Sequence, residues 1–84
     1  MPWEVRLTAK AERDLRSLPP GDQSAARLAI DRLATDPSSV HLRKLAGKQS
    51  EWRVRVGRWR IRLYLEQGIT YVERILPRKD AYRD

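Results

Sequence analysis

Cysteine is absent from the 84-residue sequence, and histidine occurs once, as His41. The lack of cysteine excludes disulfides and thiolate metal sites, and a single histidine excludes histidine metal cages and His-His catalytic pairs. No apolar run approaches the ~20 residues of a membrane helix, and charge appears early, at Glu4 and Arg6, where a secretory leader would be apolar. We therefore expect a cytoplasmic protein with no membrane segment, no metal and no cofactor.

Length and composition predict a single folded domain over residues 1–84. Hydrophobic residues make up 40% of the chain and charged residues 35%, and no linker, repeat or low-complexity stretch interrupts it. These proportions are typical of a globular chain rather than a disordered one. A chain of this size buries only roughly 60% of its unfolded surface, so its core is thin.

Positive charge is concentrated in the second half of the chain. The net charge is +7, yet residues 1–36 are neutral, and residues 37–84 hold twelve basic residues against five acidic ones. A one-sided cationic surface indicates a polyanionic partner, such as nucleic acid or an acidic protein. The alternative is a surface that is merely solvated.

Hydrophobic periodicity predicts a strand at residues 3–7 and then two helices. Thr8 offers an N-cap for the first helix, which must end at the Pro-Pro-Gly of residues 19–21. The second helix, capped near Asp22, stops at Asp36 because a residue before proline disfavours helical geometry. The residues expected to face the core are Ala11, Leu15 and Leu18 in the first helix and Ala26, Ile30 and Leu33 in the second.

Three strands are expected after an irregular segment at residues 38–50. Apolar and basic residues alternate over 51–56 and again over 59–65, from Trp59 to Leu65, whereas the apolar residues of 69–76 are out of phase and leave that register open. The predicted fold is α+β in the order β-α-α-β-β-β. Two helices cover one face of a mostly antiparallel sheet.

The hairpin around Gly57 carries the strongest functional signal. A type II′ turn at Gly57-Arg58 sets Val54 opposite Ile61 on an apolar face. On the other face it sets Arg55 opposite Arg60 and Arg53 opposite Arg62. Like charges opposed across strands destabilise a sheet by up to about 1 kcal/mol per pair. A solvated sheet surface explains one or two such arginines, whereas a phosphate site explains all four, because the planar guanidinium binds phosphate oxygens in pairs.

Other polar and aromatic residues have weaker interpretations. The three tryptophans are in phase with aliphatic strand residues, which favours core packing over base stacking. Tyr64 falls on the face that carries the arginines, where it either contacts a ligand or is an ordinary sheet-surface tyrosine. Arg43, Lys44 and Lys48 are expected to contact a phosphate backbone, with a solvated loop as the alternative.

Three segments together resemble the signature of the RelE/ParE toxin superfamily: Leu-Ala-Gly at 45–47, the hairpin at 51–64 and the closing stretch at 74–82. The resemblance extends over nearly the whole chain. It implies the toxin of a type II toxin-antitoxin system, a ribosome-dependent endoribonuclease that cleaves mRNA in the A site. The 2′-hydroxyl would attack the adjacent phosphate, and the 5′-oxygen would leave.

The same resemblance implies a set of site residues. Its catalytic members are Arg53, Arg55, Arg60, Arg78 and Tyr82, and Arg62 joins the basic residues of 43–48 in RNA binding. Arg60 matches the arginine that stabilises the transition state, and its replacement by alanine is expected to cost almost no stability. Lysines stand at 53 and 55 in the best-known member, and arginine is a poor base, so Tyr82, Glu51 or Asp80 is expected to take the proton.

Two alternatives accompany this interpretation. A ParE-type toxin has the same scaffold but inhibits DNA gyrase and is not a nuclease. A non-catalytic RNA-binding module is the other, although we expect no exposed aromatic stacking platform of the kind that such modules use. The implied partners are an acidic RelB-like antitoxin, the ribosome and mRNA.

Overall fold

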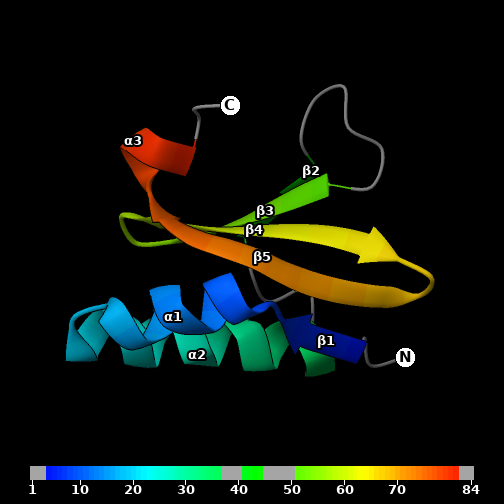
Figure 1. The fold of residues 1–84 in the computed structure, drawn as a ribbon, viewed down its shortest axis with the longest axis horizontal. Helices are drawn as coiled ribbons and strands as arrows, with labels where there is room; N and C mark the ends of the chain where they lie inside the picture. Colours follow the sequence, from blue (N-terminus) through cyan, green and yellow to red (C-terminus); the bar gives the residue numbers. More distant parts are fainter. Residues whose placement is uncertain (1–3, 37–40, 45–50, 82–84) are drawn as a thin grey trace.

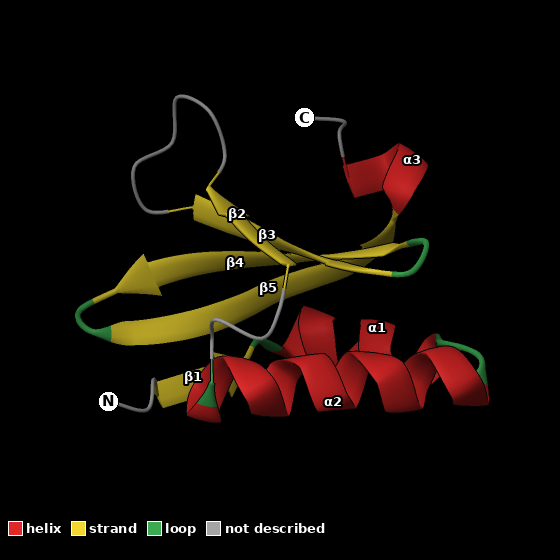
Figure 2. Ribbon diagram, turned by 180° about the vertical axis from the view of Figure 1, so that it is seen from behind, coloured by secondary structure: helices red, strands yellow, loops and turns green. Residues whose placement is uncertain are grey.

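The computed structural model describes residues 4–36, 41–44 and 51–81. In chain order, its elements are β1 (Glu4–Leu7), α1 (Ala9–Ser17), α2 (Pro20–Thr35), β2 (His41–Lys44), β3 (Glu51–Val56), β4 (Trp59–Glu66), β5 (Ile69–Pro77) and α3 (Arg78–Ala81). The described strands form one five-stranded sheet in the order β1-β5-β4-β3-β2. Helices α1 and α2 lie on one face of this sheet, and α3 lies on the opposite side, at one end (Figure 1, Figure 2). None of the described helices is long and apolar enough to cross a membrane.

The predicted α+β architecture is confirmed, with three differences. Strand β2 pairs antiparallel with β3, although it lies inside the segment that was expected to be irregular. The sequence did not indicate this strand, because His41–Lys44 contains a single aliphatic residue and shows no alternation. The short helix α3 was not predicted. Strand β1 pairs with β5 in parallel, so the sheet is mixed. Periodicity cannot give this last pairing, because it does not say which edge of the sheet the first strand joins.

The helix boundaries follow local chemistry. The Thr8 hydroxyl accepts a hydrogen bond of 3.1 Å from the Ala11 backbone N–H, as predicted for an N-cap. Helix α2 begins at Pro20 rather than near Asp22, and its N-cap residue provides no side-chain hydrogen bond. Proline is well suited to a first turn, where its missing N–H is not needed. The helix ends at Thr35 with Asp36 as its C-cap, as predicted.

The core lies between the two helices and the sheet. The residues predicted on the buried face of each helix are all buried. The strands contribute Val54, Ile61, Leu63, Val72 and Ile75. Trp52 and Trp59 pack against this cluster, which confirms their structural interpretation, and Trp3 lies outside the described residues. Leu65 is in phase with the buried residues of β4 but is 48% exposed, because β3 begins opposite Tyr64 and does not extend beside Leu65.

A β-bulge in β5 explains why that segment was out of phase. Arg62 pairs with Arg74 and Leu63 with Val72, so Glu73 is an extra residue on β5. The bulge moves the buried positions of β5 from even to odd numbers, from Thr70 and Val72 to Ile75. A strand with alternating hydrophobicity on both sides of one inserted residue gives no continuous period, which is what the sequence showed.

Helix α1 and its N-cap hold the bulge in place. The Thr8 hydroxyl donates to the Glu73 carbonyl at 3.0 Å, and the Asp14 carboxylate accepts from the Ile75 N–H at 2.9 Å. Asp14 also accepts two hydrogen bonds from the Arg74 guanidinium, at 2.8 and 3.2 Å. The pairing of β5 with β1 ends at Val72. Beyond that residue, the side chains of Thr8 and Asp14 provide hydrogen bonds to the edge of β5 in place of β1.

Candidate functional site

The turn at Gly57 has the predicted geometry. Gly57 has a φ of +57° and Arg58 does not have a positive φ, as a type II′ turn requires. Arg55 pairs with Arg60 and Arg53 with Arg62, which confirms the predicted register. The alternating residues Val54 and Ile61 are completely buried on the helix side. The four arginines alternate with these residues and therefore belong to the opposite face of the sheet, which we call the arginine face.

The four arginines have different surroundings. The side chain of Arg55 is exposed and forms no hydrogen bond or ion pair within the part of the chain that the structure describes. Arg60 is only 6% exposed, and its Nη1 donates to the carbonyl oxygens of Gly57 and Trp59, both at 2.9 Å. The contacts of α3 with β4 and β5 place that helix over this end of the arginine face (Figure 1). Arg60 thus has a fixed guanidinium, whereas Arg55 is accessible.

Arg62 lies between two carboxylates. Its Nη2 is 3.8 Å from Glu51 Oε1, and its Nε is 4.0 Å from Glu73 Oε1. Both distances are too long for hydrogen bonds, and the buried Nε has no acceptor among the described residues. The side chain is 25% exposed. The two carboxylates reduce the positive charge around Arg62 without saturating its donors.

The remaining predicted site residues are only partly described. Arg78 is exposed at the start of α3, and its backbone N–H donates to the Arg58 carbonyl at 2.9 Å, next to the hairpin turn. Arg43 pairs with Arg53, which extends that row of arginine positions onto β2, and Lys44 pairs with Trp52. Tyr82 and Lys48 lie outside the described residues.

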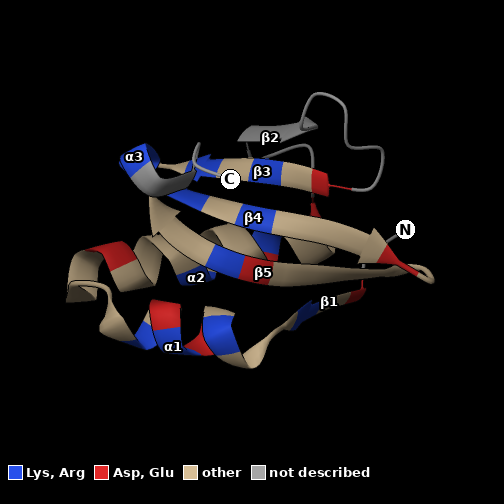
Figure 3. Cartoon of the chain, turned by 45° about the horizontal axis from the view of Figure 1, so that its top comes forward, with Lys and Arg blue, Asp and Glu red and all other residues tan. Residues whose placement is uncertain are grey.

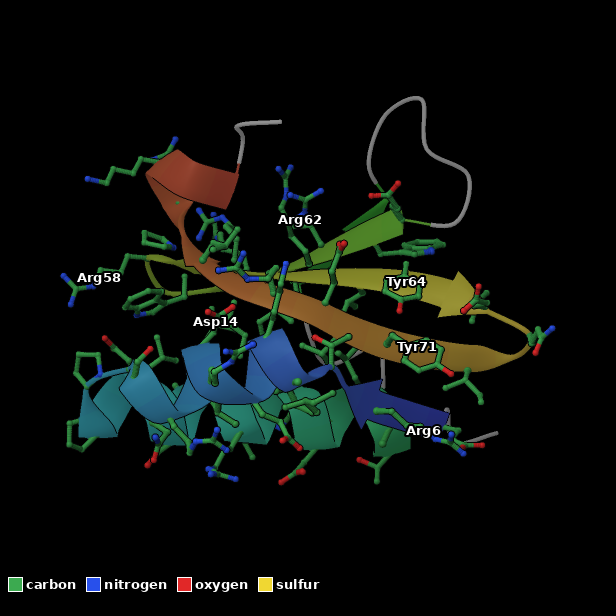
Figure 4. The ribbon with its side chains drawn as sticks, in the orientation of Figure 1. Arg6, Asp14, Arg58, Arg62, Tyr64 and Tyr71 are labelled. Carbon is green, nitrogen blue, oxygen red and sulfur yellow. The ribbon has the colours of Figure 1, made fainter. Side chains whose placement is uncertain are left out.

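Two tyrosines that belong to neighbouring strands occupy the other end of the arginine face. The rings of Tyr64 and Tyr71 stack with their centroids 5.0 Å apart and an interplanar angle of 19° (Figure 4). Partial desolvation, with the nearby Glu66, Tyr71 and Glu73, raises the pKa of Tyr64 above its usual value near 10. Its phenol therefore stays protonated at neutral pH and can donate a hydrogen bond.

Tyr71 was missed in the sequence, although a signal for it existed. Gln67 and Gly68 both have positive φ, 51° and 79°, which is the pattern of a two-residue type I′ turn. Counting outward from such a turn pairs Tyr64 with Tyr71, as the structure does. The out-of-phase residues beyond the bulge hid this register.

Arg74 is basic but has a structural role. The hydrogen bond that Arg74 donates to Asp14 raises the pKa of Arg74 further, and the pair links α1 to β5. No group of three or more acidic or histidine side chains converges on a metal-binding geometry in residues 4–36, 41–44 and 51–81. The site is therefore defined by guanidinium, carboxylate and phenol groups on one sheet face.

A family model described as the ParE toxin of type II toxin-antitoxin systems matches residues 5–82. The chain belongs to this family. It is 26% identical over 89 residues to "Putative toxin RelE1" of Methanocaldococcus jannaschii, and the match covers 100% of this chain and 99% of the relative.

Solved structures of related toxins have the same fold. A chain of the RelB-RelE antitoxin-toxin complex from Methanococcus jannaschii superposes with a TM-score of 0.78 at 22% identity, over 93% of this chain and 95% of the other. A chain of the RelBE2 toxin-antitoxin complex from Mycobacterium tuberculosis gives 0.75 at 24% identity, over 93% and 100%. The protein is thus a type II toxin with a RelE-like fold, as the resemblance implied.

Proposed function

We propose that this toxin is an endoribonuclease that cleaves mRNA in the ribosomal A site. The register that gathers Arg53, Arg55, Arg60 and Arg62 on one face of the sheet is the observation that supports it most. Such a face carries like charges across strands at a cost to stability. A bound polyanion removes that cost, and RNA offers phosphates at regular intervals.

In the proposed cleavage reaction, the arginines have different roles. The 2′-oxygen of one nucleotide forms a bond to the adjacent phosphorus, and negative charge develops on the phosphate oxygens. The bond to the 5′-oxygen then breaks, and this oxygen takes a proton from solvent as it leaves. Arg60 suits the stabilisation of that charge because two carbonyls fix its orientation before the substrate binds. Arg55 is accessible and suits initial capture of the phosphate. Arg78 and Tyr82 complete the proposed catalytic set, with Tyr82 orienting the substrate.

Proton transfer needs a group other than arginine, because arginine does not lose its proton at ordinary pH. Glu51 is a described carboxylate on the arginine face, 3.8 Å from Arg62 and paired with Tyr64 across the strands. Glu51 therefore lies at the opposite end of the hairpin from Arg60, which pairs with Arg55. We assign the acceptance of the 2′-hydroxyl proton to Tyr82, the member of the proposed catalytic set that is not an arginine and can carry a proton.

An acidic antitoxin of the RelB type is the proposed partner, beside the ribosome and mRNA. The related toxins above were solved in complexes with antitoxins. The arginine face would attract an acidic segment by the same charge that attracts RNA. One surface then serves both activity and neutralisation.

Inhibition of DNA gyrase is the second candidate, because the matching family model is that of ParE toxins. The two functions are separated by inducing the toxin, mapping transcript 5′ ends, and running a gyrase-dependent DNA cleavage assay in parallel. The nuclease predicts new 5′ ends within translated regions and intact DNA. Broken DNA without new transcript ends would contradict the nuclease and establish the gyrase target instead.

A further inference from the structure

The stacked tyrosines are continuous with the arginine face. Tyr64 lies two residues along β4 from Arg62, on the same side of the strand, and its partner Tyr71 lies beside it on β5 (Figure 4). Positions two apart on a strand are separated by about 7 Å. Both tyrosines are partly exposed, so aromatic surface is accessible at this end, contrary to the expectation from the sequence that no aromatic platform is exposed.

Charge distinguishes the two ends of the face. Glu51 pairs with Tyr64 across the strands, and Glu66 and Glu73 are close enough to add to the desolvation that raises the pKa of Tyr64. Carboxylates repel phosphate, so an RNA strand would not place its backbone over the tyrosines. The arginines attract phosphate at the other end. The part of a nucleotide that suits the tyrosine end is its uncharged base.

We infer that Tyr64 and Tyr71 form a stacking platform for a nucleobase of the RNA strand whose phosphates the arginine face holds. This inference rests on the proposed function and adds a base-binding subsite to it, separate from Tyr82. Stacking on an aromatic ring accepts any base, because every base has a π-face. The platform would therefore strengthen RNA binding with little dependence on sequence.

The competing explanation is that the pair only stabilises the sheet. Cross-strand aromatic pairs commonly do so, without any ligand. The two explanations differ in one measurable respect: a structural pair changes unfolding and leaves the RNA affinity of folded protein unchanged.

The test measures binding of a fluorescently labelled, 2′-O-methylated single-stranded RNA hexamer by anisotropy over a series of salt concentrations. Methylation removes the attacking hydroxyl, so binding is measured without cleavage. The double variant Tyr64→Leu/Tyr71→Leu should lose roughly ten-fold in affinity with an unchanged salt slope, because stacking involves no counterions. Tyr64→Phe/Tyr71→Phe keeps both rings and should bind like the wild type.

Arg55→Ala provides the opposite pattern, because loss of one phosphate contact should reduce the magnitude of the salt slope by about 0.7. Circular dichroism verifies that each variant is folded. A folded leucine variant with wild-type affinity would overturn the platform, and so would a phenylalanine variant as weak as the leucine one, since the hydroxyls would then be responsible. If the wild type itself shows no salt-dependent RNA binding, the platform fails, whereas the nuclease, which acts on the ribosome, fails only if induction produces no new transcript 5′ ends.

Discussion

At the scale of single residues, Arg55 and Arg60 should separate activity from stability. Arg55 is exposed and faces another arginine, so Arg55→Ala should reduce mRNA cleavage and leave the free energy of unfolding unchanged or slightly higher. Arg60 is buried and bonds two carbonyls. Arg60→Ala should therefore abolish cleavage and cost about 1–3 kcal/mol in stability, not the near-zero cost expected from the sequence.

Urea unfolding and transcript 5′-end mapping measure the two effects. Arg27→Ala is the matched control, because it removes one exposed arginine from α2 on the opposite side of the molecule. Equal urea midpoints for Arg60→Ala and the wild type would show that the carbonyl bonds contribute nothing to the fold. Undiminished cleavage by Arg55→Ala would remove this residue from the site.

The same two residues show how far the sequence could be interpreted. A glycine turn and a period of two were enough to put Arg55 opposite Arg60, because strand pairing is a local property of a tight hairpin. The burial of Arg60 was not predictable, since it depends on α3, which joins the sheet from the far end of the chain. The approach of Glu73 to Arg62 depends on the bulge in β5, which the sequence showed only as a loss of phase.

At the scale of elements, α1 acts as a clamp on the bulged strand. The Asp14 side chain is 18% exposed and is bonded by both Arg74 and the Ile75 backbone N–H. Removing it leaves a cation and a strand donor without their acceptor. Asp14→Ala should lower the free energy of unfolding by about 2 kcal/mol.

Asp31→Ala on the exposed side of α2 is the control for helix propensity and charge, and it should stay within about 0.5 kcal/mol of the wild type. Chemical denaturation measures both variants. Equal losses for the two would mean that the clamp contributes no more than an ordinary surface aspartate. The clamp could not be predicted, because a single aspartate in an amphipathic helix looks like any solvated residue until the register of β5 is known.

The sequence predicted those helices and strands in which apolar residues recur with a clear period. The two helices and the β3–β4 hairpin were found because each has three or more apolar residues in phase. Strand β2 was missed because it is short, lies at the sheet edge and has one aliphatic residue to pair with Val54. Its membership of the sheet is a tertiary property, decided by the hydrogen bonds that β3 offers.

At the scale of the whole molecule, the fold separates charge. Helices α1 and α2 cover one face of the sheet and come from the neutral part of the sequence, whereas the opposite face carries the basic hairpin (Figure 3). The helices provide the apolar partner that the sheet needs on one side. The other side can then hold like charges together, at the expense of stability, until an anion binds.

This separation predicts that multivalent anions stabilise the free protein beyond the effect of ionic strength. Any ligand that binds only the folded state raises stability by an amount set by its concentration relative to its dissociation constant. At ten times that constant the gain is about 1.4 kcal/mol, which for a domain of this size raises Tm by roughly 8 °C. Thermal melts in phosphate and in sodium chloride of equal ionic strength compare the two.

The source of the gain is identified by the same melts on two variants. Arg55→Ala removes an accessible phosphate-binding group and should lose part of the difference between phosphate and chloride, whereas Arg27→Ala should retain it. Screening alone would raise Tm equally in both salts, because screening depends on ionic strength and not on the identity of the anion. Equal melting temperatures of the wild type in phosphate and in chloride would therefore mean that the arginine face binds no phosphate. The like charges on that face would then only repel one another.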